Sequence, residues 1–251
     1  MVFHSCEELA VSSCHCGKHA GGMTESDVVR TPLSPTPRST VTRQRARATT
    51  ERDALDAILD AGLICHLGVL LDGAPVVLPT TYGRDGNLLY LHGSTGAGNL
   101  RAALTGPVSV AVTHLDGIVY ARSAMHFSMN YRSAVVHGHP VELTDSDERL
   151  HALRTIVDHV APGSWDHARP PTKKEMAATV VLALDLTEAS VKTRTGDPVD
   201  DTDDLASDTW AGVLPLRNIF ENPIPSADLA VSIDIPEHVL ARVSGTPVSA
   251  G

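Results

Sequence analysis

The sequence has few aromatic side chains and a deficit of positive charge. Aromatic residues make up 4% of the 251 residues, and 20 Lys and Arg stand against 30 Asp and Glu, a formal net charge of −10. Affinity for nucleic acid comes mainly from neutralising its phosphates, so this balance argues against a nucleic-acid partner. It leaves room for a small anionic ligand in a local basic pocket.

Long apolar runs are also missing. No window approaches 18 uninterrupted apolar residues, so we expect no membrane span. The N-terminus lacks the basic-then-apolar order of a secretory signal. We therefore expect a cytoplasmic protein that does not contact membranes.

Cysteines are scarce and poorly arranged for a metal. Cys6, Cys14 and Cys16 lie near His15 and His19 but lack the paired C-x₂-C spacing of structural zinc sites. Cys65 stands alone in an apolar run and is expected to be a buried thiol. His137 and His139 would share one strand face, but two ligands do not complete a zinc site.

Composition divides the chain into three parts. Residues 1–50 are rich in Ser, Thr, Pro, Gly and Arg without apolar periodicity, which predicts a disordered N-terminal arm. Residues 51–196 carry the helix and strand patterns of one domain. In the extension 197–251, we expect an acidic connector and then an apolar segment that packs on the barrel or on a second subunit.

Within the domain, most of the regular elements should be strands. The Asp72-Gly73 and Asp85-Gly86 turns separate three short β-rich runs, which predicts an antiparallel meander. Further strands are expected at 107–115, 133–143 and 179–196. Helices are expected at 51–62, after the glycine-rich loop 92–99, and at 145–162, where Asp145 or Ser146 would be the N-cap. The pattern indicates a mainly β protein with short helices, a small antiparallel barrel of six strands.

The segment "HGSTGAGN", residues 92–99, is a candidate anion site. It is neither a Walker loop nor a dinucleotide fingerprint, but it places a glycine-rich turn before a helix N-terminus. Such a turn offers backbone N–H groups to an anion, or is simply a strand-to-helix connection.

Cations that could meet a phosphate are few. Between Asp53 and Thr144 there are four, Arg84, Arg101, Arg122 and Arg132, and Lys192 and Arg194 share one face of the last strand. The sequence offers no Gly-x-Ser-x-Gly elbow or other nucleophile with a local base, so covalent catalysis is not expected.

Four segments in order carry a family resemblance: the helix at 51–62, "LPTTYGRDGNLLYLHGSTGAGNL", "FSMNYRSAVVHGHPVEL" and "VKTRTGDPVDD". Residues 50–220 resemble the pyridoxamine 5′-phosphate oxidase-like FMN-binding split barrels. Within them they are most similar to flavin-nucleotide-binding proteins related to nitroimidazole-resistance reductases. The resemblance implies a six-stranded antiparallel split barrel that forms a homodimer, with FMN in a groove between the subunits.

The resemblance also implies where the cofactor would lie. The flavin ring would lie along one strand, the phosphate at the glycine-rich loop, and a third strand and the C-terminal part of either subunit would line the pocket. In that order, the residues are Pro79, Thr80, Thr81 and Tyr82; Ser94, Gly98 and Asn99; Asn130, Tyr131, Arg132 and Ser133; and Lys192, Arg194 and Trp210. Relatives often carry a cation where this chain has residues 97–99, so the counter-charge would come from Arg101, Arg132 or the Lys192 and Arg194 pair.

The implied activity is electron transfer between reduced flavin and a small organic substrate or acceptor, with the chemistry supplied by the cofactor. Two alternatives stay open. One is a flavin carrier without turnover, and the other is a haem or metal binder that uses His137 and His139.

Overall fold

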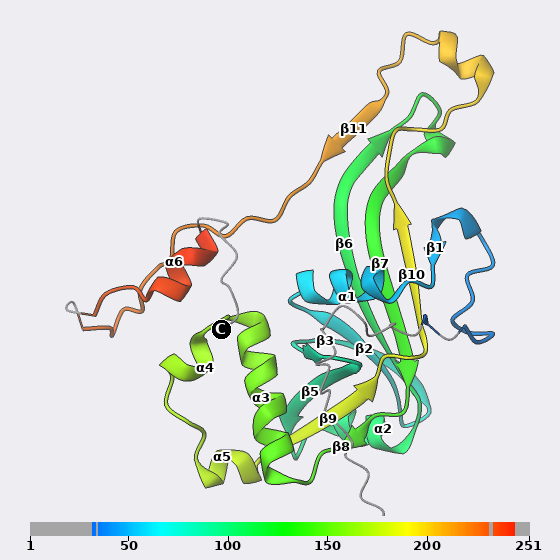
Figure 1. The fold of residues 1–251 in the computed structure, drawn as a ribbon. Helices are drawn as coiled ribbons and strands as arrows, with labels where there is room; N and C mark the ends of the chain where they lie inside the picture. Colours follow the sequence, from blue (N-terminus) through cyan, green and yellow to red (C-terminus); the bar gives the residue numbers. More distant parts are fainter. Residues whose placement is uncertain (1–31, 34, 231–232, 244–251) are drawn as a thin grey trace, which may run out of the picture. The chain divides into compact units, whose positions relative to one another are not determined.

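The computed structural model describes residues 32–33, 35–230 and 233–243, which form two antiparallel sheets (Figure 1). The larger sheet has the order β1(Ala48–Thr49), β10(Ala189–Arg194), β7(Ser128–Gly138), β6(Val108–Tyr120), β2(Cys65–Leu71), β3(Ala74–Thr80), with β11(Gly212–Pro215) also paired to β6. The smaller sheet has the order β4(Gly83–Asp85), β5(Leu88–Ser94), β9(Thr179–Asp185), β8(Val141–Glu142).

Helices are short and lie outside the sheets. They are α1(Arg52–Ala61), α2(Gly98–Thr105), α3(Ser146–Val160), α4(Ser164–His167), α5(Lys173–Ala177) and α6(Glu237–Val243), with 3₁₀ turns η2(Arg45–Arg47), η3(Ala124–His126) and η4(Thr202–Ala206). The Asp145 carboxylate caps α3 by accepting from the backbone N–H groups of Asp147 and Glu148, as the sequence predicts. The expected fold class, mainly β with short helices, is confirmed. No helix among the described residues is long and apolar enough to cross a membrane.

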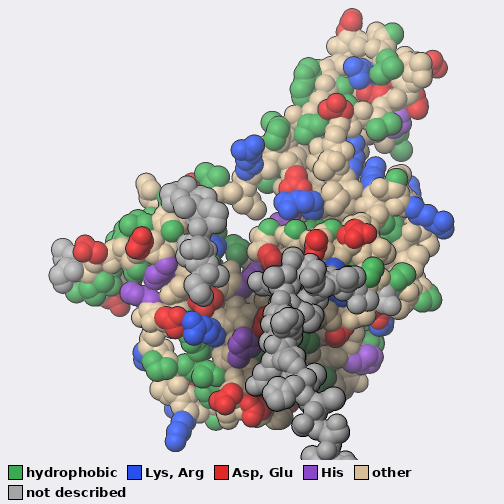
Figure 2. Space-filling model, viewed as in Figure 1, with side chains coloured by type: hydrophobic (Ala, Val, Ile, Leu, Met, Phe, Trp, Pro, Cys, Tyr) green, Lys and Arg blue, Asp and Glu red, His purple; other side chains and the backbone are tan. Residues whose placement is uncertain are grey.

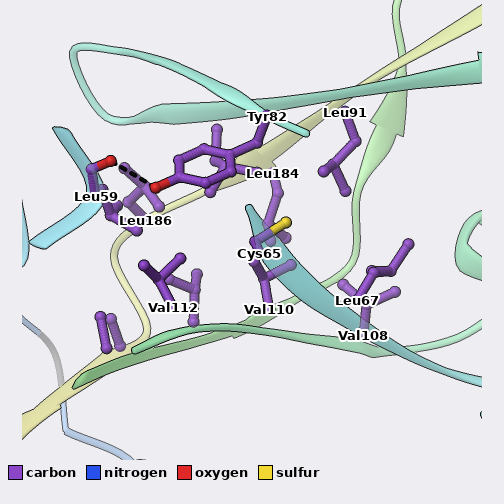
Figure 3. Packing of buried hydrophobic residues seen from close by; sticks show 14 of the residues in the cluster. Leu59, Cys65, Leu67, Tyr82, Leu91, Val108, Val110, Val112, Leu184 and Leu186 are labelled. Carbon is purple, nitrogen blue, oxygen red and sulfur yellow. Dashed lines mark hydrogen bonds between the residues drawn. The ribbon is translucent and has the colours of Figure 1, made fainter. Parts of the chain in front are cut away.

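The hydrophobic core lies where α1 packs on strands whose residues are alternately buried and exposed. Cys65, Leu67 and Val69 of β2 are buried, and every second residue of β6 from Val108 to Val112 is buried with them, as the period of a strand requires. Figure 3 shows Cys65, Leu67 and the three β6 valines in one cluster with Tyr82. The Tyr82 hydroxyl donates to the Leu59 carbonyl oxygen at 2.5 Å.

The strand arrangement corrects two expectations. The Asp-Gly turns do form the β2–β3 and β4–β5 hairpins, but β3 and β4 belong to different sheets, so the three runs are not a meander. The run 179–196 also divides into β9 and β10, one in each sheet. The described residues hold eleven strands where six were expected, because this division and short edge strands add to the count.

The expectation that residues 1–50 form a disordered arm does not hold for residues 32–33 and 35–50, which the structure describes. Leu33 is 2% exposed and belongs to the main core, β1 pairs with β10, and Arg38 binds Glu188 at 2.7 Å. The rest of the expected arm, residues 1–31, lies outside the described residues. At the other end, β11 pairs with β6, and the Asp200 carboxylate binds Arg122 at 2.8 Å, so the extension contacts the barrel.

Candidate functional site

A cavity of about 830 Å³ lies beside the end of α1. β2, β3 and β6 contribute His66, Pro79 and His114 to its wall, α3 contributes His159, and the C-terminal extension contributes Arg242. The wall also includes Ile64, Val112 and Phe220, so the cavity joins apolar residues to three imidazoles, one guanidinium and the carboxylate of Asp60, which binds Arg84. This is the composition of a site for a large, mostly apolar ligand that carries some charge.

The three imidazoles differ in their bonding. His114 Nε2 lies 2.9 Å from the Ile58 carbonyl oxygen, and His159 Nε2 lies 2.6 Å from that of Gly62. A carbonyl oxygen only accepts, so each of these nitrogens carries a hydrogen and donates it. Burial lowers the pKa of His159, which keeps that ring neutral. His66 is exposed, and no described residue forms a hydrogen bond or ion pair with its ring, so its nitrogens are available to a ligand.

The residues expected along the flavin ring lie close to this cavity but face different ways. Pro79 is opposite His66 in the β2–β3 ladder and lines the cavity. Thr80 is opposite the core residue Cys65, and Thr80 and Thr81 are half-buried. The Tyr82 side chain is fully buried in the core, so the predicted contact of this residue with flavin stays a prediction for its backbone.

The glycine-rich loop lies elsewhere. The Ser94 Oγ accepts from the Gly96 N–H at 3.2 Å, and Gly98 and Asn99 begin α2 without a side-chain cap. Gly98 lies near Leu71, at the opposite end of β2 from Cys65, and six strand residues span about 20 Å. Within one chain, therefore, this loop and the end of β3 do not form a single pocket.

The third expected group lies on β7 and β10. Arg194 is buried and donates to the Asn130 side chain and to the carbonyl oxygens of Gly196 and Asp197. Asn130 donates in turn to Gly196. These two residues therefore hold the turn after β10, and their polar groups already have partners.

The other residues of this group are more accessible. Tyr131, Ser133 and Lys192 are half-buried, and Lys192 lies opposite Ser133 in the ladder. The Ser133 hydroxyl donates to the Lys192 carbonyl oxygen at 3.3 Å. Trp210 lies apart from them in the extension, where its exposed ring packs edge-on against Tyr120 with the ring centroids 5.6 Å apart.

Most of the cations that the sequence offered for a phosphate already bind carboxylates or buried acceptors. Arg84 binds Asp60, Arg122 binds Asp200, and Arg132 binds Asp116 at 2.9 Å, while Arg194 is enclosed as described above. Arg101 donates to the Thr95 carbonyl oxygen. Lys192 forms no ion pair with any described residue.

The cavity histidines were not identified from the sequence. The sequence shows a concentration of histidines between His66 and His139, but it singles out His137 and His139, which do not line the cavity. His137 Nδ1 lies 2.8 Å from the Ser109 hydroxyl oxygen. His66, His114 and His159 are brought together by strand pairing and by helix packing, which local spacing does not reveal.

Comparisons with known proteins agree with this fold. The family model described as pyridoxamine 5′-phosphate oxidase matches residues 51–193. The structure of the flavocytochrome Anf3 from Azotobacter vinelandii superposes with a TM-score of 0.80 at 37% identity, covering 84% of this chain and 99% of that chain. The FAD and haem binding protein from Mycobacterium smegmatis gives a TM-score of 0.75 at 38% identity, covering 78% and 97%.

A more distant neighbour shares the fold alone. A putative 5-nitroimidazole antibiotic resistance protein from Bacteroides thetaiotaomicron matches with a TM-score of 0.50 at 20% identity, over 58% of this chain and 85% of that one. No curated protein sequence matches the chain significantly.

Proposed function

Because the chain belongs to the pyridoxamine 5′-phosphate oxidase-like split-barrel family, we propose that it is a flavin-binding electron-transfer protein that also binds haem. The observation that carries the haem part is the cavity of about 830 Å³ in which His66 alone of three imidazoles has no described protein partner. Two similar structures, at 37% and 38% identity, are a flavocytochrome and an FAD and haem binding protein, and their names support both cofactors.

The residues of the cavity fit a haem. Haem iron binds imidazole nitrogens, and His66 is the residue that would hold it here. The apolar residues Ile64, Val112 and Phe220 suit the macrocycle, and Arg242 would neutralise a propionate. Arg242 lies over the Phe220 ring, 4.3 Å from its centroid, so this guanidinium is already positioned at the cavity wall.

The residues of the larger sheet fit a flavin less completely within one chain. Lys192 offers a cation that pairs with no carboxylate of the described residues, and Ser133 and Tyr131 lie beside it. The glycine-rich loop and the end of β3 are too far apart to join them, so we propose that a homodimer completes the flavin site. FMN was the flavin expected from sequence.

When bound, flavin supplies two-electron and haem one-electron chemistry. The role of the protein is to bind these groups, orient them and exclude water. Beside the cavity, the neutral ring of His159 donates to the Gly62 carbonyl oxygen. We propose a small organic molecule as the electron acceptor, as the family resemblance implies, and the cytoplasm as the physiological setting.

The test is the cofactor content of purified protein. We expect flavin absorbance and a Soret band, and reduction of both by a chemical reductant. His66→Ala should remove the Soret band and leave the flavin, because His66 is exposed and its loss does not disturb the core. The matched control His139→Ala changes an exposed histidine away from the cavity and should keep both bands.

Two results would overturn the proposal: a colourless protein that binds neither added cofactor, or a Soret band unchanged by His66→Ala. Steady-state oxidation of NAD(P)H or a reduced dye, with a panel of acceptors, separates an oxidoreductase from a carrier without turnover.

A further inference from the structure

The acidic connector after β10 folds back onto the loop that joins β6 to β7. His126, the last residue of the turn η3 in that loop, lies beside Asp200, Asp201 and Asp204 of the connector. Figure 2 shows acidic side chains on the part of the molecule where Figure 1 places the turn before β11. A connector that only spans a distance does not need its carboxylates gathered at one imidazole, so this contact calls for a physical reason.

Three side chains of the contact could share one metal ion. A ring nitrogen of His126 and one carboxylate oxygen each of Asp201 and Asp204 lie within 4.8 Å of one another. Imidazole and carboxylate are ligands of first-row divalent metal ions. Bonds of about 2.1 Å to one ion put its ligand atoms about 3–3.5 Å apart, and small side-chain rotations reach this distance. The Asp201 side chain is 83% exposed and therefore free to rotate.

A buried carboxylate lies on the other side of the His126 ring. The Asp200 side chain is 1% exposed and accepts from the backbone N–H and the guanidinium of Arg122, at 2.9 and 2.8 Å. It lies 3.7 Å from His126 Nδ1, a buried atom that has no hydrogen-bond partner in the described part of the chain.

This arrangement prepares the opposite ring nitrogen for an ion. His126 Nε2 faces the Asp201 carboxylate at 3.9 Å. A hydrogen on Nδ1 is favoured by the carboxylate of Asp200, and it leaves the lone pair of Nε2 available. A carboxylate behind one ring nitrogen and a metal ion on the other is the usual surrounding of a metal-binding histidine.

Protein cations do not balance the charge at this contact. Arg122 pairs with Asp200, and no Lys or Arg among the described residues forms an ion pair with Asp201 or Asp204. The fold therefore holds two carboxylates close together against their mutual repulsion, which a divalent cation would offset.

We propose that His126, Asp201 and Asp204 bind a divalent ion of a first-row transition metal, and that Asp200 orients the imidazole. Three protein ligands leave the remaining positions of the ion to water. The ion would fasten the C-terminal extension to the loop between β6 and β7, next to the packing of Trp210 on Tyr120. This site is independent of the proposed flavin and haem function.

The experiment measures binding of Mn²⁺ to the whole chain through the loss of the EPR signal of free Mn²⁺. Mn²⁺ is the probe because thiolates select softer metals, so Cys6, Cys14 and Cys16 compete little for it. We expect one bound ion for each chain, displaced by Zn²⁺, which binds nitrogen and oxygen ligands more tightly.

The variants identify the ligands. His126→Ala and Asp204→Asn should each weaken Mn²⁺ binding at least about tenfold. Asp203→Asn removes the same charge from the neighbouring position of η4 and is the matched control, which should change the affinity less than about twofold. Mn²⁺ should also raise the unfolding temperature of the wild type but not of His126→Ala. Unfolding of each variant without metal shows that it is folded.

Three outcomes would overturn the proposal. The first is no binding of Mn²⁺ at concentrations up to about 1 mM. The second is an equal loss of affinity in Asp203→Asn and Asp204→Asn, which would reduce the site to general attraction by an acidic surface. The third is an unchanged affinity in His126→Ala, which would remove the imidazole from the site.

Discussion

The Arg132 guanidinium donates to both carboxylate oxygens of Asp116, at 2.9 and 3.0 Å. Asp116 lies at the β-bulge between Leu115 and Gly117, where one residue of β6 has no partner in the ladder of β7. The bulge therefore directs this carboxylate to the arginine that the sequence had suggested for a flavin phosphate. The pair is half-exposed and satisfied within the protein.

Substitution of Arg132 should therefore change flavin binding little. We expect Arg132→Ala to alter flavin affinity less than about twofold, and to lower the free energy of unfolding by no more than about 1 kcal/mol, as for other partly exposed ion pairs. Asp116→Asn is the matched variant, and titration of flavin with urea unfolding at pH 7 measures both quantities. A large loss of flavin affinity in Arg132→Ala alone would restore the sequence-based role.

The same pair predicts a pH effect at acidic pH. The hydrogen bond and charge of Arg132 lower the pKa of Asp116 below its ordinary value of 3.8. A carboxyl group with a depressed pKa in the folded state contributes stability that is present above pH 3.8 and is lost as the pH falls through the lower folded value. The difference in unfolding free energy between wild type and Asp116→Asn should therefore shrink below this pH.

Tyr82 should contribute to stability and not to flavin binding. Burial raises the pKa of its hydroxyl, which stays protonated and donates to the Leu59 carbonyl oxygen. Tyr82→Phe removes this hydrogen bond from the core and should destabilise the protein by about 1–2 kcal/mol. Chemical unfolding measures this change, and flavin titration of the same variant should give the wild-type affinity. A tenfold weaker flavin affinity at unchanged stability would contradict the core assignment.

His159 should make stability depend on pH near neutrality. Burial lowers its pKa below the ordinary value of 6.5, in spite of its hydrogen bond to Gly62. The neutral ring is therefore favoured in the folded state, so its contribution is present above pH 6.5 and is lost as the pH falls through the lower folded value. The free energy of unfolding measured from pH 8 to pH 5 should decline less steeply in His159→Gln than in wild type. His139→Gln, at an exposed position, should follow the wild-type curve, and an equal effect of both would contradict the assignment.

The sequence predicts those parts of the fold that depend on local patterns. The alternation of apolar residues predicts β2 and β6, the Asp-Gly turns predict two hairpins, and Asp145 predicts the start of α3. It does not tell which sheet a strand joins: β3 passes to β4 through Thr81 and Tyr82, and the flanking Pro79 and Gly83 do not distinguish a change of sheet from a turn within one sheet.

The candidate site was harder to predict for the same physical reason. Arg194 finds its partner Asn130 at a separation of 64 residues, and His114 reaches Ile58 across 56 residues. Such long-range hydrogen bonds decide which polar groups remain free for a ligand, and they arise from tertiary packing. Residues 35–50 were also misjudged, because strand pairing and the two charges of the Arg38–Glu188 contact order a segment whose composition alone suggests disorder.

The β6–β7 hairpin extends away from the smaller sheet (Figure 1), and exposed apolar side chains at and near its tip predict a homodimer. Met125, Phe127 and Met129 are 87%, 51% and 50% exposed, and Trp210 beside them is 66% exposed. A cluster of this kind on a protein surface is normally covered by a partner, and a second copy would also bring together the parts of the flavin site that one chain holds apart.

Light scattering should therefore give twice the chain mass of 26.6 kDa. Phe127→Asp with Met129→Asp should give the monomer and weaken flavin binding together, because charge would have to be desolvated at the contact. Val141→Asp, at a residue 65% exposed on β8, is the matched control and should remain dimeric. A wild-type protein that is monomeric at micromolar concentration and still binds flavin would show that one chain forms the site alone.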